Sequence, residues 1–245
     1  MAGNASAPQA GAFRLAAAAP TLAIGTLSGD GIVNAVEAAS DLPVTGSTSA
    51  EPGQVVTVHL LDGSTVLGTY YVFVQPDGTF ALNIPQADLP ADGNYSITAD
   101  VSNNAGTPAV QVQAPLQIDT TPPAIAITHI ADSATNLADD NFTFDLNERG
   151  FDNSTYQSTA TVAHLPVVSG TTTAEVGQTV TVVFNGTSYT ATVQQGGTWA
   201  VTLSEADAKA LVHGNTYTVT ASVTDLAGNL ATPASATLDV NIAPA

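Results

Sequence analysis

Three oxygen-bearing side chains stand close together near the start of the chain. They are Asp30, Asn34 and Glu37, spaced by four and three residues in the stretch Gly29-Asp-Gly-Ile-Val-Asn-Ala-Val-Glu-Ala38. Calcium takes roughly six to eight oxygens from carboxylates, amides and backbone carbonyls, so this loop could supply part of a calcium site. It is shorter than an EF-hand loop and has fewer acids, which excludes that motif.

Further acids occur near the joins between segments of the chain. The structural alternative is ordinary turn chemistry, because aspartate beside glycine or asparagine caps loops without a metal. As a group, however, many acids with almost no lysine or arginine repel one another, and counter-ions relieve that repulsion. We therefore expect a calcium-binding set that adds five aspartates to the first loop: Asp119, Asp132, Asp139, Asp140 and Asp225.

The charge balance excludes several classes of function. The 245 residues carry 21 acidic and 3 basic side chains, a formal net charge of -18, which disfavours binding to nucleic acid or to an anionic membrane surface. No apolar run approaches the roughly 20 residues of a membrane span. The absence of cysteine excludes disulfides, thiolate catalysis and cysteine-ligated zinc.

The sequence shows no catalytic constellation, and we expect that the chain is not an enzyme. Its four histidines are scattered and form no His-Glu-x-x-His motif, and there is no Gly-x-Ser-x-Gly motif. Adjacent acids such as Asp139 and Asp140 are more often solvated or metal-bound than catalytic. Phe80 and Trp199 occupy equivalent inward positions, which favours core packing over a sugar-stacking platform.

The elements that position these side chains repeat along the chain. Val44-Thr-Gly-Ser-Thr-Ser-Ala-Glu-Pro-Gly-Gln-Val-Val-Thr-Val58 returns 124 residues later as Val168-Ser-Gly-Thr-Thr-Thr-Ala-Glu-Val-Gly-Gln-Thr-Val-Thr-Val182. Later blocks recur in the same order, among them Gly78-Thr-Phe-Ala-Leu82 and Gly197-Thr-Trp-Ala-Val201. Two copies of one module therefore follow each other, which is typical of an array of units in line.

Within each copy the apolar residues alternate with polar ones. Val56, Val58 and Leu60 alternate with Thr57 and His59, and the second copy repeats this pattern, which predicts strands with one buried face. A short helical turn is expected at Ser204–Asp207, where the serine could cap and Asp207 could answer it three residues later. About seven short strands in about 100 residues indicate an antiparallel β-sandwich. We predict an all-β chain of two tandem Ig-like antiparallel β-sandwich domains.

Tyrosine and proline refine this division. Tyr95 and Tyr217 each follow a Gly-Asn turn and open a strand, which is the placement of a tyrosine corner. Tandem prolines restrict the backbone, so Asp119-Thr-Thr-Pro-Pro123 predicts a stiff connector. We predict five segments: a tail or linker at 1–19, domain 1 at 20–119, a proline-rich linker at 120–123, domain 2 at 124–240, and the start of a further linker at 241–245.

The second copy contains an insertion. About 21 extra residues lie near 139–163 and include four aromatic side chains. One interpretation is an added strand or hairpin whose aromatics fill core. The other is a contact surface specific to this module.

Four motifs together resemble a known family. They are the Asp119–Pro123 join, the Gly29–Ala38 opening, the Ala-Glu-x-Gly-Gln-x-Val-Thr-Val strand, and Asp225-Leu-Ala-Gly-Asn229. In this order they resemble the bacterial Ig-like repeats of giant, type I-secreted (RTX/Bap-like) surface adhesins of Gram-negative bacteria. The resemblance implies extender modules that project a binding domain from the cell and bind calcium at or near their junctions. The first copy departs from it, because Asn103 stands where the second copy has Asp225.

The function expected from the sequence is a calcium-stiffened spacer of an extracellular, cell-surface adhesin in biofilm formation or host attachment. We expect a monomer whose partners are neighbouring Ig-like repeats of the same chain, with Ca²⁺ as its cofactor. A host or matrix protein or a glycan is a further candidate partner. Two alternatives remain open: a ligand-binding tip module that uses the insertion, and accessory domains of a secreted polysaccharide-active enzyme.

Overall fold

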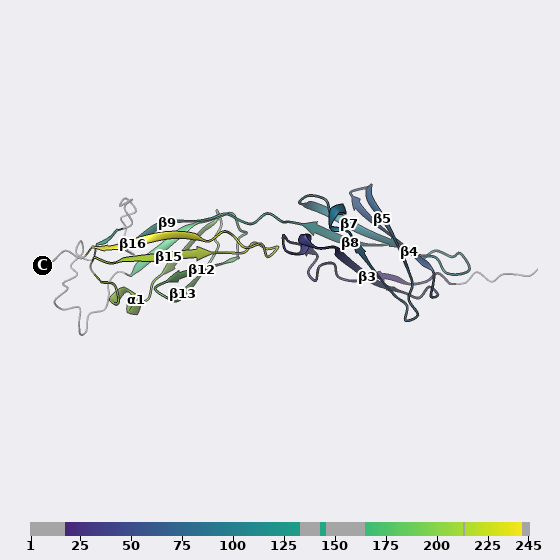
Figure 1. Cartoon of the computed structure of the whole chain (residues 1–245), viewed down its shortest axis with the longest axis horizontal. Coiled ribbons are helices and arrows are strands. Elements are labelled where there is room, and N and C mark those ends of the chain that lie inside the picture. Colours follow the sequence, from purple (N-terminus) through teal and green to yellow (C-terminus); the bar gives the residue numbers. More distant parts are fainter. Residues whose placement is uncertain (1–17, 133–142, 146–164, 213, 242–245) are drawn as a thin grey trace, which may run out of the picture. The chain divides into compact units, whose positions relative to one another are not determined.

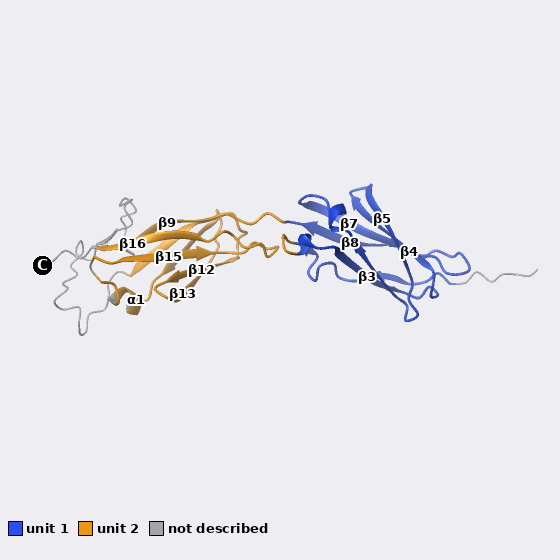
Figure 2. Cartoon of the chain, viewed as in Figure 1, with its two compact units in different colours: residues 1–33, 37–119 blue, residues 34–36, 120–245 orange. Residues whose placement is uncertain are grey.

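A computed structural model describes residues 18–132, 143–145, 165–212 and 214–241 (Figure 1). The chain divides into two compact units (Figure 2). Unit 1 comprises residues 1–33 and 37–119, and unit 2 comprises residues 34–36 and 120–245. Among the described residues, no helix has the length and apolar character needed to cross a membrane.

Unit 1 is built from two β-sheets. The three-stranded sheet is antiparallel and has the order β1 (Leu22–Ile24), β3 (Leu42–Thr48), β6 (Thr79–Ile84). The five-stranded sheet has the order β2 (Ile32–Val33), β8 (Val112–Ile118), β7 (Gly93–Asp100), β4 (Val55–Asp62), β5 (Thr65–Phe73). Its short strand β2 runs parallel to β8, and the other pairs are antiparallel. Two short 3-10 helices complete the unit: η1 (Glu37–Ala39) and η2 (Gln86–Asp88).

Unit 2 repeats this arrangement. Its three-stranded sheet has the order β14 (Thr198–Thr202), β11 (Pro166–Thr172), β9 (Ile125–Asp132). Its five-stranded sheet has the order β10 (Thr143–Asp145), β16 (Ala234–Asn241), β15 (Thr216–Ser222), β12 (Thr179–Phe184), β13 (Thr187–Thr192). Strand β10 is parallel to β16, as β2 is parallel to β8. One short helix, α1 (Glu205–Lys209), stands between β14 and β15.

Each unit has its own hydrophobic core, supplied by the alternating residues of the strands. The buried positions of β4 include Val58 and Leu60, and those of β12 include Val182 and Phe184. Phe80 and Trp199, which are 1% and 2% exposed, lie at the same place in the two cores, so the prediction that both are core residues is confirmed. The all-β prediction of two tandem Ig-like antiparallel sandwiches is likewise confirmed.

Local predictions from the sequence are also confirmed. The Tyr95 hydroxyl donates to the Ala91 carbonyl at 2.8 Å, and the Tyr217 hydroxyl donates to the Ala210 carbonyl at 3.3 Å, as a tyrosine corner requires. Helix α1 is capped by Ser204, whose Oγ accepts from the Asp207 N–H at 3.1 Å. The Ser204 N–H, however, donates to the Tyr189 hydroxyl, not to the helix's own acid.

The insertion falls mostly outside the described residues. Within it, the structure describes β10, which has a counterpart in β2 of unit 1 and therefore is not an element added to unit 2. The two interpretations of the remaining inserted residues stay predictions.

Candidate functional site

Each unit contains an equivalent tight loop, between β7 and β8 in unit 1 and between β15 and β16 in unit 2. The two loops carry different polar residues. An isolated bridge closes each loop, Ser102 to Pro108 in unit 1 and Thr224 to Leu230 in unit 2. The second residue of the loop is Asn103 in unit 1, which is 7% exposed. Its equivalent, Asp225 in unit 2, is 6% exposed. A buried polar side chain needs hydrogen-bond partners, so these contacts decide what each residue does.

Asn103 uses both ends of its amide. Its Oδ1 accepts from the N–H groups of Ala105 at 3.1 Å and Thr107 at 2.9 Å, and its Nδ2 donates to the Ala18 carbonyl at 3.0 Å. Because a carboxylate accepts but does not donate, aspartate could not form the last of these bonds. Asparagine in the first copy is therefore accounted for by its local partners.

Asp225 has both carboxylate oxygens in hydrogen bonds. Its Oδ1 accepts from the Asn229 N–H at 2.8 Å, and its Oδ2 accepts from Asn229 Nδ2 at 3.0 Å. The first and last residues of the Asp225–Asn229 motif thus hold each other across the loop. This is the turn chemistry that the sequence left open as an alternative, although each carboxylate oxygen keeps a second lone pair that a cation could use.

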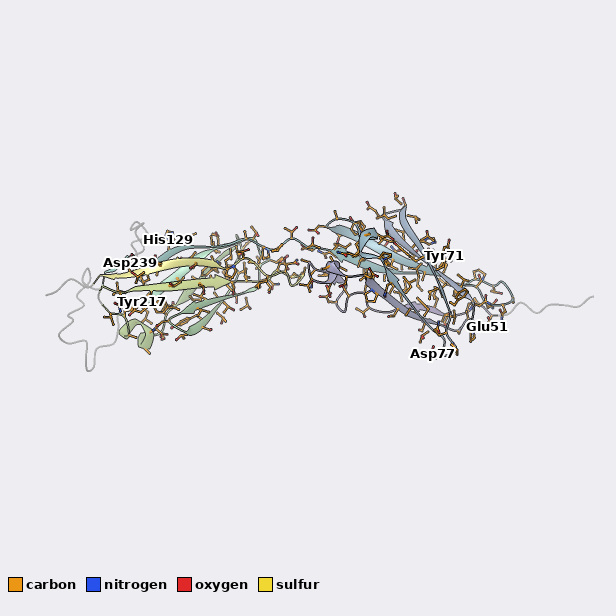
Figure 3. The ribbon with its side chains drawn as sticks, viewed as in Figure 1. Glu51, Tyr71, Asp77, His129, Tyr217 and Asp239 are labelled. Carbon is orange, nitrogen blue, oxygen red and sulfur yellow. The ribbon has the colours of Figure 1, made fainter. Side chains whose placement is uncertain are left out.

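A repeated glutamate that the sequence analysis did not single out also binds this loop. The Glu51 carboxylate accepts from the Asn104 N–H, and the Glu175 carboxylate accepts from the Leu226 N–H, both at 2.9 Å. Glu51 is labelled in Figure 3. The only signal for this role was the recurrence of Ala-Glu-x-Gly-Gln at the same point of each copy. In unit 2 this contact brings Glu175 to the loop that contains Asp225.

The loop that contains Asp30, Asn34 and Glu37 is divided by strand β2. Asp30 lies before the strand and is exposed, and its Oδ1 accepts from the Ile32 N–H at 2.9 Å. Glu37 lies in η1 and is half-buried. Asn34 directly follows Val33, the last residue of β2, and its Oδ1 accepts from the Val36 N–H at 2.9 Å.

Asp119 lies beside the C-terminal end of β2, whereas Asp30 precedes its N-terminal end. Val33 pairs with Ile118 of β8, and the Asp119 N–H donates to the Val33 carbonyl at 3.0 Å. Asn34 and Asp119 are therefore the residues that directly follow the last pair of the β2–β8 ladder. Asp30 lies in the turn that precedes Ile32, the first residue of β2, and therefore at the opposite end of this short strand.

The other predicted ligands lie at the edge of the description or outside it. Asp132 is the last residue of β9, and its side chain is not described. Asp139 and Asp140 lie outside the described residues. Across the part of the chain that the structure describes, no group of three or more His, Cys, Asp or Glu side chains is placed to hold a metal ion. The eight-residue calcium set therefore stays a prediction.

A tyrosine and an aspartate join the outermost strand of each five-stranded sheet to a helical turn. In unit 1 the Tyr70 hydroxyl of β5 donates to the Asp88 carboxylate of η2 at 3.0 Å. Burial, together with this bond to a carboxylate, raises the pKa of Tyr70 to about 12. In unit 2 the equivalent pair is Tyr189 of β13 and Asp207 of α1, and hydrogen bonds from Tyr189 and Ser204 hold the pKa of Asp207 below its ordinary value.

Comparison with known proteins gives a partial family assignment. Residues 144–242 match the family of the bacterial Ig-like domain. None of the curated proteins compared with this chain matches it significantly.

Several solved structures are similar to the chain. One is a 1.5-MDa bacterial ice-binding adhesin studied for host cell surface retention, with 24% identity over 91% of this chain and 65% of that chain and a TM-score of 0.49. Another is a Ca²⁺-stabilized adhesin with which an Antarctic bacterium binds ice, with 26% identity over 91% and 49% of the two chains and a TM-score of 0.48. Fibronectin(III)-like modules of CbhA from Clostridium thermocellum show 12% identity over 90% and 95% of the two chains, with a TM-score of 0.43. The chain thus spans less than two thirds of each of the two adhesin structures.

Proposed function

We propose that this chain is an extender segment of a large bacterial surface adhesin, located outside the cell and serving biofilm formation or attachment. The observation that carries the proposal is the repetition of one sandwich, with the same internal bonds, around a proline-rich join. Thr48 and Thr172 illustrate it: each hydroxyl donates to a carbonyl of the preceding segment, of Thr21 at 2.6 Å and Ala124 at 2.7 Å. A spacer needs such equivalent units and no catalytic side chains of its own.

The family match over residues 144–242 supports a bacterial Ig-like module. The composition supports export, since a chain without cysteine forms no disulfides and can leave the cell unfolded. We propose secretion by a type I system on that ground and on the resemblance described above. The immediate partners are further Ig-like repeats of the same chain.

We further propose that calcium stiffens this spacer. Asn34 and Asp119 directly follow Val33 and Ile118, the last pair of the β2–β8 ladder, and Glu37 follows three residues after Asn34. Asp30, Asp132, Asp139, Asp140 and Asp225 are the other proposed ligands, and Glu175 binds the same loop as Asp225. A site with a Kd of about 0.1 mM in about 1 mM calcium would stabilise the fold by roughly 1.4 kcal/mol.

Two measurements on the whole chain test the proposal. Thermal unfolding and small-angle X-ray scattering are compared in calcium, in magnesium and in chelator. We expect calcium to raise the midpoint of unfolding and to lengthen the particle, and we expect magnesium to do neither. Identical melting and scattering in calcium and chelator would refute calcium stiffening.

A pair of charge-matched variants separates specific binding from relief of repulsion. Asp119→Asn removes a proposed ligand, and Asp62→Asn removes an acid of the β4–β5 hairpin. Each change makes the net charge one unit less negative, so the two variants relieve repulsion equally and differ in whether a proposed ligand is removed. We expect Asp119→Asn to lose most of the calcium response and Asp62→Asn to keep it. An equal loss in both variants would mean that calcium acts as a diffuse counter-ion.

A further inference from the structure

Strand β5 is an exposed hydrophobic edge of unit 1. It has β4 as its one neighbour in the five-stranded sheet. Its outward side chains include Tyr71 and Phe73, which are 69% and 63% exposed, and Val66 and Leu67 near its start are about half exposed. Tyr71 is labelled in Figure 3. Isolated apolar residues on a surface are ordinary, but a row of them along a sheet edge marks an interaction site.

The backbone of β5 also has open hydrogen-bonding groups. Val74, which follows the strand, accepts from the Gly53 N–H at 2.9 Å and donates to the Gln54 carbonyl at 2.9 Å, so its backbone faces the side of β4. Successive residues of an antiparallel strand face opposite ways, so the backbone groups of Thr69, Tyr71 and Phe73 face away from β4. A further antiparallel strand could bond to these three residues once it displaces Gln75 Nε2, which donates to the Phe73 carbonyl at 3.2 Å.

The usual protections of a sheet edge are mostly missing. Proteins block edge strands with lysine, proline, inward charges or bulges. From Thr65 to Val74 there is no proline and no charged residue. The one device present is an irregularity between Leu60 and Leu61 of the β4 register, which leaves Leu67 without a partner at the hairpin end. The stretch from Gly68 to Phe73 pairs regularly.

The equivalent strand of unit 2 lacks these features. Strand β13 has six residues, Thr-Ser-Tyr-Thr-Ala-Thr, where β5 has nine. Counting from the shared Tyr70 and Tyr189, the positions of Tyr71 and Phe73 are taken by Thr190 and Thr192. The exposed aromatic row therefore is not a requirement of the sandwich, because the same fold forms without it.

The partner that best fits this edge is another copy of the same strand. An antiparallel strand can pair with itself around a two-fold axis, which gives a closed, self-complementary contact. A register centred on Tyr71 would set Tyr71 opposite its copy and Phe73 opposite Thr69, with about six new backbone hydrogen bonds. The net charge of -18 opposes association of two copies, and the Asp88 carboxylate, bonded to Tyr70, lies beside β5; within the strand itself, however, no charged residue would face its copy.

We propose that β5 is a self-association edge, through which two copies of this chain pair their unit 1 sheets. The interface is small, so association is weak, with a Kd on the order of 10 to 100 µM. At low concentration the chain is the monomer expected from its sequence. The inference goes beyond the spacer function, since it gives the segment a contact with a second molecule, and it does not involve calcium.

Sedimentation of the whole chain in chelator, from about 1 to about 500 µM, tests the proposal. We expect a reversible monomer–dimer equilibrium. Tyr71→Lys/Phe73→Lys should weaken the dimer at least about tenfold, because charges on an edge oppose strand pairing. Thr190→Lys/Thr192→Lys places the same charges on the equivalent strand of unit 2 and should leave the dimer unchanged. Circular dichroism and melting of each variant establish that it is folded.

A gentler variant and a local probe cover the case in which lysine disturbs unit 1. Tyr71→Thr/Phe73→Thr gives β5 the residues that β13 already accommodates, and it should also lose the dimer. Hydrogen exchange should show the amides of Thr69, Tyr71 and Phe73 becoming protected as concentration rises. A wild type that stays monomeric throughout would overturn the proposal, whether or not Tyr71 binds another ligand such as a glycan. A dimer that survives in the threonine variant would overturn it as well.

Discussion

Adding a single methyl group at Gly170 should lower the stability of unit 2 and leave that of unit 1 unchanged. Gly170 of β11 lies against the ring of Trp199 and against the backbone of β9. A Cβ at this position would stand 1.9 Å from the Ala126 carbonyl oxygen and 2.5 Å from Trp199 Cζ2, well inside the 3.0 Å that real Cβ atoms essentially never cross. Gly170→Ala therefore forces either the paired strand or the indole ring to move.

The size of the effect follows from what has to move. The carbonyl is held in the β9–β11 ladder, so it must shift by at least about 1 Å at the expense of neighbouring hydrogen bonds. Overpacking of a core costs about 1 to 3 kcal/mol, and two such contacts place this variant near the upper end. At about 4 to 8 °C per kcal/mol for a domain of about 100 residues, a loss of about 3 kcal/mol lowers the unfolding midpoint of unit 2 by about 12 to 24 °C.

The chain contains its own reporter and control for this experiment. Trp199 is the one tryptophan in the sequence and lies in the core of unit 2, so its fluorescence follows the unfolding of that unit. In unit 1 the equivalent glycine is Gly46, whose Cβ would stand 2.2 Å from Phe80 Cζ. Gly46→Ala should lower a calorimetric transition while leaving the Trp199 transition in place. A fluorescence midpoint for Gly170→Ala within about 3 °C of wild type would refute the argument.

Three further changes test the loops and the tyrosine pairs. Glu175→Ala should destabilise unit 2 by about 0.5 to 1.5 kcal/mol through loss of the exposed hydrogen bond to the Leu226 N–H, while Glu175→Gln, which keeps an acceptor, should cost less than half as much by denaturant titration. Asn103→Asp should destabilise unit 1 by about 1 to 3 kcal/mol at pH 7, and the lost stability should return as the pH falls and the new carboxyl is protonated. A loss of stability that does not change with pH would contradict this explanation. Because the pKa of Tyr70 is raised to about 12, its neutral form stabilises the fold below about pH 10, and that contribution is lost as the pH rises from about 10 to about 12. Tyr70→Phe should flatten the alkaline fall of the unit 1 melting midpoint over this range, and an unchanged slope would exclude Tyr70 as its source.

Much of the fold could be predicted because its causes are local. Alternation of apolar and polar residues places β4 and β12 correctly, since a strand exposes its two faces in turn. The tyrosine corners and the Ser204 cap depend on partners within seven residues, so their motifs are visible in the sequence. The candidate site was less predictable. A strand divides the loop of Asp30, Asn34 and Glu37, and the ladder that sets Asn34 beside Asp119 joins residues far apart in the chain.

The order of residues is enough to identify a repeated all-β sandwich, because repetition and period-two patterning are properties of that order. What the repeated side chains touch depends on the folded arrangement. Glu51 and Glu175 bind loop amides more than 50 residues away, and Gly46 and Gly170 make room for aromatic rings of a paired strand. The tertiary structure also decided that β5 is an edge. Its hydrophobic residues resemble those of any buried strand, and whether a strand has one neighbour or two depends on pairing between distant segments, which no local pattern records.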